Sequence, residues 1–356
     1  MDVVYVSNEA YARHLCVSLC SLCDSNQDED ALRFYVISTG ISPGSEEKIR
    51  ETAASFDREV RFLPFSDLRE RLGAADTGPF DVSTMGRLFL GEILPEELTR
   101  VLYLDCDTVV LRPLHRLWRT GLKGCVLGAV EEPTIYPEVR EYLDLAANEP
   151  YFNAGVLLID LGKWRADNVQ SRVLEYYKRI GSRALFNDQD ALNGLLRGRI
   201  RELLPKWNFF TNYRYFRYST LVERSPSYSL IPRESFCAAK RHPAVVHYAG
   251  DERPWRAGAR NPYGAAYERY LEMTPWAGTP KEKGYEREMF LYHGMNLCTA
   301  LFPGLREAAG SRYVQKLIRE RAERAESEER EERAGAAEAT ENAACAGDAG
   351  AERRDA

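Results

Sequence analysis

The stretch Arg100–Leu111 carries two apolar runs on either side of an Asp-Cys-Asp sequence. A strand that is apolar on both faces must be covered on both faces, which is typical of parallel sheets flanked by helices. The stretch therefore predicts a buried strand that leaves its sheet where the side chains become polar. Alternate residues of a strand point to the same face, so Asp105 and Asp107 should share one side and Cys106 the other.

Asp105 and Asp107 form the first candidate site. Two carboxylates held this close repel each other unless a cation lies between them, and a divalent metal that carries a phosphorylated ligand is a common reason for such a pair. The alternative is that both are turn or capping residues, because aspartate is frequent in those roles. The rest of the sequence favours the metal site.

Short apolar segments alternate with amphipathic helical segments from the N-terminus to about residue 255. This alternation predicts the α/β class, with a mostly parallel twisted sheet flanked by helices. The expected strands are 2–7, 32–38, 60–63, 100–111, 126–130, 151–160, 200–204 and 244–247, and the expected helices are 11–24, 45–56, 84–94, 166–180 and 187–197. The turn after the first strand lacks the glycines of a dinucleotide-binding fingerprint, and no P-loop occurs.

Beyond residue 258 the alternation stops and aromatic helical segments follow, at 263–273, 285–301 and 311–320. The last residues are mostly alanine, glutamate and arginine, a composition too poor in apolar side chains to pack against a core. We therefore predict a catalytic domain at 1–256, a C-terminal helical segment at 257–320 and a disordered charged tail at 321–356.

The net charge and the number of cysteines indicate the partners and the compartment of the protein. A net charge of −6 argues against a general nucleic-acid surface, and eight cysteines in 356 residues fit free thiols in a reducing compartment. No signal peptide and no apolar run of membrane-spanning length is recognisable, which predicts a cytoplasmic protein. Peripheral contact with the inner face of the membrane is left open. Cys16, Cys20 and Cys23 recur at helical spacing and are expected to be buried hydrophobes rather than metal ligands.

Polar residues follow several of the expected strands: Asn8, Asp105 with Asp107, Glu132, Asn153 and His247. The ligand crevice of a doubly wound sheet lies at the carboxyl ends of its strands, so these side chains are expected at one edge. Two carboxylates and an imidazole suit Mn²⁺ better than Ca²⁺, and the thiolates of a structural zinc site are absent from the set. A lone histidine is more often a core or surface residue, but a glycine and a cation close to His247 favour a ligand.

These motifs resemble family 8 glycosyltransferases, among them bacterial lipopolysaccharide galactosyl- and glucosyltransferases. The resemblance extends from residue 1 to about residue 255, and its carriers are Arg87-Leu88, residues 101–107, Tyr151 to Val156, Asp188 to Asn193 and His247 to Gly250. It implies the GT-A fold and the retaining transfer of a hexose, glucose or galactose, from a UDP-sugar. A glycan or glycolipid of the cell envelope is the acceptor that it implies.

The resemblance also implies roles for individual residues. Asp105, Asp107 and His247 match metal-binding positions, where Mn²⁺ or Mg²⁺ would contact the donor diphosphate. The positions that contact the donor sugar at the catalytic centre are matched by Arg87, Asn153, Asp188 and Gln189, and the positions that bind the nucleotide are matched by Asn8, Tyr11, Gly250 and Arg253.

Some positions depart from the family pattern. Ala10 replaces a polar residue in the uracil-binding turn, which weakens the expectation of a strict uridine preference. Arg253 stands where lysine is more common, and it should neutralise charge with a forked geometry. Gln189 matches the residue nearest the back face of the reacting carbon. Because an amide is a poor nucleophile, displacement on one face of the sugar is favoured over a covalent glycosyl-enzyme.

Two other functions stay open at this point. A non-catalytic nucleotide-sugar-binding protein is disfavoured, because the metal, cation and sugar-contacting positions all carry competent residues. A nucleotidyltransferase that makes the activated sugar would also use paired carboxylates. Such enzymes generally carry a glycine-rich basic loop after the first strand, and this sequence has none.

Overall fold

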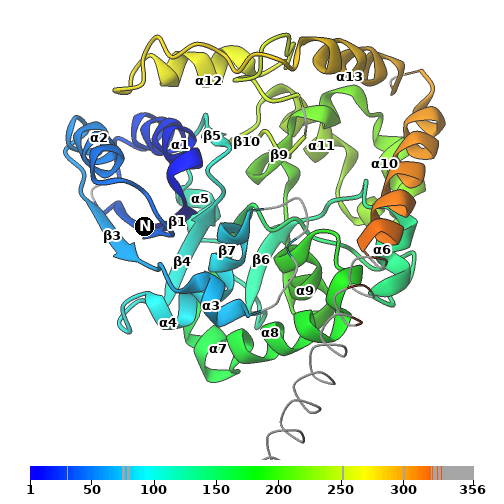
Figure 1. Cartoon of the computed structure of the whole chain (residues 1–356), viewed down its shortest axis with the longest axis horizontal. Coiled ribbons are helices and arrows are strands. Elements are labelled where there is room, and N and C mark those ends of the chain that lie inside the picture. The colour runs from blue at the N-terminus through cyan, green and yellow to red at the C-terminus, as the bar shows by residue number, and fades with distance from the viewer. Residues whose placement is uncertain are drawn as a thin grey trace, which may run out of the picture.

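The computed structural model describes residues 1–29, 31–73, 77, 81–250, 252–299, 301–321, 323, 327 and 330. Its centre is a seven-stranded sheet in the order β3-β2-β1-β4-β7-β6-β8 (Figure 1). The strands of this sheet are β1 (Asp2–Ser7), β2 (Arg33–Ser38), β3 (Val60–Pro64), β4 (Arg100–Leu104), β6 (Leu127–Val130), β7 (Val156–Asp160) and β8 (Ile200–Leu203). A smaller sheet, in the order β5-β10-β9, contains β5 (Thr108–Val110), β9 (Phe209–Phe210) and β10 (Val245–His247).

The predicted α/β class and mostly parallel sheet are confirmed. Strand β1 pairs in parallel with β2 and β4, β2 with β3, and β6 with β8. Strand β7 is the exception, because it is antiparallel to both of its neighbours, β4 and β6. The start of β7 therefore lies at the same edge as the ends of β4 and β6. That direction brings Asn153, which precedes β7, to the edge where the other polar residues gather.

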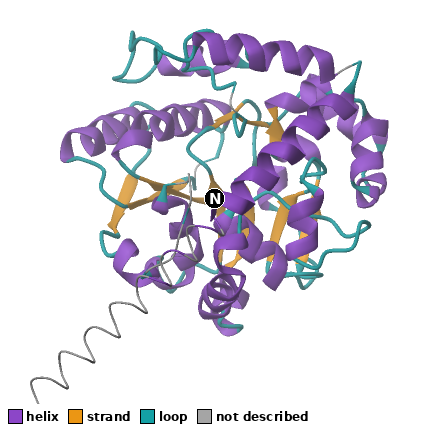
Figure 2. Cartoon of the chain, turned by 45° about the vertical axis from the view of Figure 1, so that its right-hand side comes forward, coloured by secondary structure: helices purple, strands orange, loops and turns teal. Residues whose placement is uncertain are grey.

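Helices cover both faces of the large sheet (Figures 1 and 2). On one face, Val3, Tyr5 and Leu102 lie in a core shared with α1 (Ala12–Ser25), α2 (Pro43–Ala54) and α5 (His115–Trp118). The core on the opposite face is shared with α3 (Leu68–Leu72), η2 (Val82–Phe89), α4 (Leu90–Ile93), α6 (Pro137–Tyr142), α7 (Leu161–Ala166), α8 (Val169–Ile180) and α9 (Asn187–Leu195). The two-sided cover accounts for the near-continuous apolar sequences of β1 and β4.

Helix α1 shows how the sequence pattern produces this cover. Leu15, Leu19 and Leu22 recur at helical spacing and are fully buried, as are Cys16 and Cys20. The burial of the cysteines confirms the prediction that they are apolar core residues. Burial raises the pKa of each of these two thiols to about 12, so both stay protonated and unreactive.

The second half of the chain forms the layer beside the small sheet. It contains α10 (Tyr218–Arg224), α11 (Arg233–Arg241), α12 (Gly264–Leu271), α13 (Glu286–Thr299) and the short helical turns η4 (Pro205–Trp207), η5 (Thr211–Tyr215) and η6 (Pro226–Leu230). Two further short turns lie elsewhere, η1 (Glu9–Tyr11) between β1 and α1 and η3 (Gly181–Arg183) between α8 and α9. Residues 303–321 are also helical. Helix α12 packs on α1, and α13 contacts η5. The division into a catalytic domain and a C-terminal segment remains a prediction, and nearly all of the predicted charged tail lies outside the described residues.

Three sequence predictions about elements are wrong. The stretch 100–111 is not one strand, because β4 ends at Leu104 and β5 begins in the other sheet. The strand expected at 151–160 is shorter, because β7 begins only at Val156. The helix expected at 166–180 is confirmed as α8, which begins at Val169 after Asn168 in a left-handed conformation with φ 49°. The segment 84–94 is mostly a 3-10 helix, η2, followed by the single turn α4. None of the described helices is long and apolar enough to cross a membrane.

Candidate active site

Asp105 and Asp107 lie in the turn that joins the two sheets. Thr108 Oγ1 donates to the carbonyl of Asp105 at 2.8 Å, and the Asp105 amide donates to the carbonyl of Gly155 at 2.8 Å, so the turn is anchored at both ends. Cys106 is buried and directs its thiol toward the Val6 carbonyl, 3.3 Å away. The two carboxylates thus share one side, as predicted, but through turn geometry rather than strand alternation.

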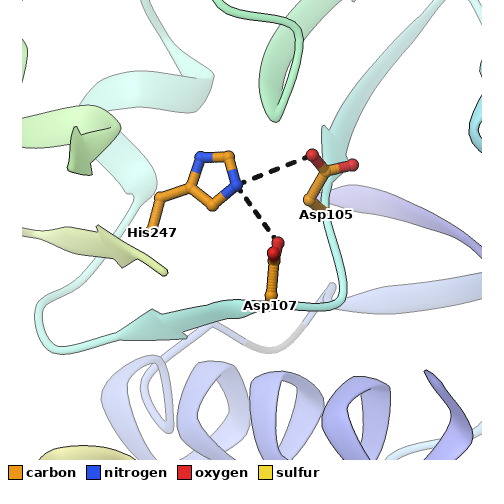
Figure 3. Close-up of side chains that lie close together, drawn as sticks. All are labelled: Asp105, Asp107 and His247. Carbon is orange, nitrogen blue, oxygen red and sulfur yellow. Dashed lines mark ion pairs between the residues drawn. The ribbon is translucent and has the colours of Figure 1, made fainter. Parts of the chain in front are cut away.

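His247 ends β10 and faces this turn because β10 pairs with β5 in antiparallel register, His247 opposite Thr108. Its Nε2 lies 3.1 Å from Asp107 Oδ1 and 3.7 Å from Asp105 Oδ2 (Figure 3). One ligand atom from each of the three residues lies within 4.8 Å of the others. The structure therefore brings together the O,O,N set that the sequence predicted.

Asn208 orients the histidine ring. Its Oδ1 lies 2.9 Å from His247 Nδ1, an arrangement in which Nδ1 carries a proton and Nε2 presents its lone pair to the carboxylates. Carboxylates accept hydrogen bonds but do not donate them, so this contact requires either a proton or a metal ion at Nε2. Burial opposes both charges, yet the attraction between them lowers the pKa of Asp107 and raises the pKa of His247.

Gly155 leaves the space in which this cluster fits. A Cβ at this position would lie 2.3 Å from His247 Cε1 and 2.8 Å from Asp105 Oδ2. Only glycine therefore allows the start of β7 to approach the three candidate ligands so closely. The donor set, the histidine orientation and this cradle all fit a divalent metal.

Arg87 connects the carboxylate turn to α9. Its guanidinium is buried, with Nη2 3.0 Å from Asp105 Oδ1 and Nε 2.9 Å from Asp188 Oδ2. It also donates to the Ala154 carbonyl at 2.6 Å and lies over the Tyr103 ring. Although burial opposes the charge, the two carboxylates raise the pKa of Arg87 above its ordinary value, so the side chain remains a cation.

Asp188 has an acceptor atom that no hydrogen bond uses. Burial raises its pKa to about 7, against the opposing effect of Arg87. Its Oδ2 is buried and accepts no hydrogen bond from the described residues, because the Arg87 Nε–H is directed to the Thr84 carbonyl, 3.0 Å away. This oxygen is ion-paired with Arg87 but receives no hydrogen bond, so it can still accept one from a ligand hydroxyl.

Gln189 uses its whole amide within the protein. Its Oε1 accepts from the Ala154 amide at 2.9 Å and from Asn153 Nδ2 at 2.8 Å. Its Nε2 donates to Glu132 Oε2 at 3.1 Å and to the Tyr151 hydroxyl at 3.0 Å. Both lone pairs and both protons are engaged, so the amide is held rigidly and offers no nucleophilic atom. Burial raises the pKa of Glu132, which accepts from Asn153 as well.

Asn153 joins the two halves of the site. Its Oδ1 accepts from the Gly155 amide and from Asn208 Nδ2, each at 2.8 Å, while its Nδ2 contacts Gln189 and Glu132. A continuous hydrogen-bonded chain thus runs from His247 through Asn208 and Asn153 to Gln189. The sequence interpretation missed Asn208, whose only signal is a polar residue inside the aromatic run Trp207 to Phe210.

The predicted nucleotide-binding residues form a second group beside the carboxylate turn. Asn8 Oδ1 caps η1 by accepting from the Tyr11 amide at 3.1 Å. Arg253 donates to the Tyr11 hydroxyl at 2.5 Å and lies close enough to Asp107 to interact with its charge. Arg253 Nε lies 3.4 Å from the Gly250 carbonyl. The fold therefore brings all of the predicted site residues to one edge of the sheet.

An α/β sheet with an acidic turn after β4 and a histidine beside it is the arrangement that the sequence resemblance to GT-A-type glycosyltransferases implies. Residues 2–259 match the model for glycosyl transferase family 8, and the chain belongs to that family. Its sequence is 29% identical to general stress protein A of Bacillus subtilis over 78% of this chain and 94% of that protein. It is 28% identical to the lipopolysaccharide 1,2-glucosyltransferase of Escherichia coli over 78% of this chain and 79% of that protein.

The fold is similar to a solved structure of the galactosyltransferase LgtC in complex with donor and acceptor sugar analogs. That similarity has a TM-score of 0.66 and 26% sequence identity, and it covers 81% of this chain and 100% of LgtC. The predicted family and the GT-A fold are therefore confirmed. The roles predicted for individual site residues remain predictions.

Proposed function

We propose that this chain transfers a hexose, glucose or galactose, from a UDP-sugar to a saccharide or glycolipid acceptor with retention of anomeric configuration. The observation that carries the proposal is the cluster of Asp105, Asp107 and His247, whose ligand atoms lie within 4.8 Å of one another. The names of a glucosyltransferase relative and of the galactosyltransferase LgtC support a hexose.

Asp105, Asp107 and His247 would hold Mn²⁺ or Mg²⁺. When bound, such an ion supplies positive charge that offsets the charge developing on the departing diphosphate. Asn208 keeps the His247 lone pair directed at the site, and Arg87 fixes the position of the Asp105 carboxylate. Arg253 supplies a second cation near Asp107, where the phosphates would lie.

Asp188 and Gln189 support the sugar side of the proposal. Asp188 Oδ2 is ion-paired with Arg87 but accepts no hydrogen bond, so it can accept one from a hydroxyl of the donor sugar. Gln189 offers no free lone pair, so it cannot form a covalent glycosyl-enzyme. Displacement in which the acceptor attacks the face that the diphosphate leaves is consistent with both features.

The direct experiment is a donor panel. The purified chain is incubated with UDP-, GDP- and dTDP-sugars, with and without Mn²⁺, and release of free nucleotide is measured. We expect Mn²⁺-dependent release from UDP-glucose or UDP-galactose, with Asp107→Asn as the inactive control. Mn²⁺-dependent binding of a UDP-sugar without release or transfer would favour the alternative of a non-catalytic nucleotide-sugar-binding protein. If the chain neither releases nucleotide nor binds a UDP-sugar in the presence of Mn²⁺, the proposed metal-dependent transfer is refuted.

A further inference from the structure

A row of aromatic rings leads from the metal-site histidine to two arginines. The ring centroids of His247 and Phe210 are 5.4 Å apart, those of Phe210 and Tyr213 are 4.9 Å apart, and those of Tyr213 and Phe216 are 6.1 Å apart. The guanidinium carbons of Arg224 and Arg306 lie 5.4 Å and 5.6 Å from the centroid of the Phe216 ring. Two cations therefore share one ring at the end of this row.

Among the described residues, only one of the two arginines has a carboxylate as a direct partner. Arg224 Nη2 lies 3.4 Å from Glu307 Oε2, a carboxylate whose side chain is 46% exposed. Arg306 forms no ion pair with a described residue and is held instead by Asn296, Thr299 and the Tyr292 hydroxyl. One half-exposed carboxylate is thus paired with one of the two guanidinium groups, while the buried Glu252 contacts Asn296 rather than Arg306 itself.

Arg224 also has spare donors. Its side chain is only 12% exposed, yet every hydrogen bond that it makes within the described part of the chain uses Nη2, to the Pro303 carbonyl and Glu307. Its Nε and Nη1 have no partner there and keep some contact with solvent. Burial lowers the pKa of Arg224, and the charge of Arg306 adds to that effect. A guanidinium with unused N–H donors can donate hydrogen bonds to an oxyanion.

Tyr136 connects the arginines to the reaction centre. It lies on the loop after β6, four residues beyond Glu132, and its hydroxyl is within electrostatic range of Glu132, Arg306 and Arg224. The Tyr213 hydroxyl lies 3.4 Å from Thr134 Oγ1 on the same loop. Tyr136 is therefore close enough to interact electrostatically with the arginine pair and with Glu132, which accepts a hydrogen bond from Gln189.

We propose that Arg224 and Arg306 bind an anionic group, a phosphate or a carboxylate, of the acceptor. This inference rests on the proposed function, since it assigns a charge to the substrate of the same site. The forked donors of two arginines match the oxygens of either group. The oxyanion can belong to a charged soluble saccharide or to the phosphate of a lipid-linked one. Exposed Leu301, Phe302 and Leu305 near Arg306 offer apolar contacts to the second source.

The test measures binding of glucose 6-phosphate and of glucose at saturating UDP and Mn²⁺, so that the donor site is filled. We expect Arg224→Gln and Arg306→Gln each to weaken glucose 6-phosphate binding about tenfold and to leave glucose binding unchanged. Arg217→Gln, at an exposed arginine beside α10, is the matched control and should change neither. Glu307→Gln should strengthen binding of the phosphate, because it removes the competing carboxylate.

The inference would be overturned if the arginine variants lost equal affinity for glucose 6-phosphate and for glucose. It would also be overturned if the wild-type chain did not prefer the charged probe, or if the variants changed only the KM for the donor. If an arginine variant fails to fold, Glu307→Gln still tests the inference, because an unchanged affinity for glucose 6-phosphate would count against anion binding at Arg224 and Arg306. Parallel assays with a lipid-linked sugar pyrophosphate in micelles distinguish the two sources of the anion. Charge-dependent binding without nucleotide release would reject the proposed function alone, whereas transfer without charge dependence would reject this inference alone.

Discussion

Gly155→Ala tests whether the space at the start of β7 determines the geometry of the metal site. The added Cβ would lie 2.3 Å from His247 Cε1, whereas carbon atoms ordinarily approach no closer than about 3.5 Å. The imidazole or the strand must therefore move by about 1 Å. His247 has little room to move, because it is buried, packs against Phe210 and is bonded to Asn208.

A displacement of about 1 Å is several times the roughly 0.2 Å tolerance of a metal–ligand distance. We expect Mn²⁺ affinity to fall about 100-fold, the upper end for changes that misplace a ligand, and stability to fall by about 1–3 kcal/mol from overpacking. Mn²⁺ titration by electron paramagnetic resonance measures the metal affinity, and thermal unfolding measures the stability. Nucleotide release at rising Mn²⁺ should show the same shift.

Gly44→Ala is the matched control. This glycine lies in α2, and a Cβ there would meet no atom within 4 Å, so the same substitution should leave Mn²⁺ affinity unchanged and stabilise the helix by up to about 1 kcal/mol. The reasoning would be refuted by a folded Gly155→Ala protein that binds Mn²⁺ within about threefold of wild type, since that result leaves no displaced ligand.

Three further variants test other parts of the site and the core. Asp107→Asn should abolish Mn²⁺-dependent nucleotide release while changing the melting temperature little; a large loss of stability would mark the carboxylate as structural. Asn208→Ala should weaken Mn²⁺ binding about 10–100-fold by freeing the His247 ring, and unchanged affinity would show that the bond does not orient it. Burial and the neighbouring Glu131 raise the pKa of Glu202 to about 8 from an ordinary 4.5, so the folded chain keeps this proton longer than the unfolded chain. The free energy of unfolding should therefore fall as pH rises from about 4.5 to about 8, and urea titrations of Glu202→Gln should show a flatter pH dependence.

The elements of this fold were predictable from the sequence where a local pattern determines them. The apolar run of β1 and the leucine spacing of α1 predicted their type and nearly their bounds. The antiparallel direction of β7 was not predictable in this way, because it depends on the neighbours between which the strand inserts. The break of the long strand after Leu104 also depends on tertiary structure, since the apolar residues that follow pair with β10 in another sheet.

The same distinction between local pattern and tertiary structure applies to the residues of the candidate site. Asp105, Asp107 and His247 were predictable because each follows an apolar strand and has a chemistry suited to a metal. Asn208 carries no such pattern, and its contact with His247 arises only when β9, which it directly precedes, pairs with β10. Gly155 lies within a motif that the sequence singled out, but the atoms it makes room for come from two distant segments, at Asp105 and His247.

The position of the acidic turn between the two sheets has a thermodynamic consequence. Asp105 and Asp107 follow the last residue of β4 in the large sheet, whereas His247 belongs to β10 in the small one. An ion bound by all three would cross-link the two sheets, and mass action would favour the conformation that holds them together. Divalent metal should therefore slow amide exchange in β5 and β10 more than in β2 or β3. The metal ion would then stabilise the contact between the two sheets as well as take part in the reaction.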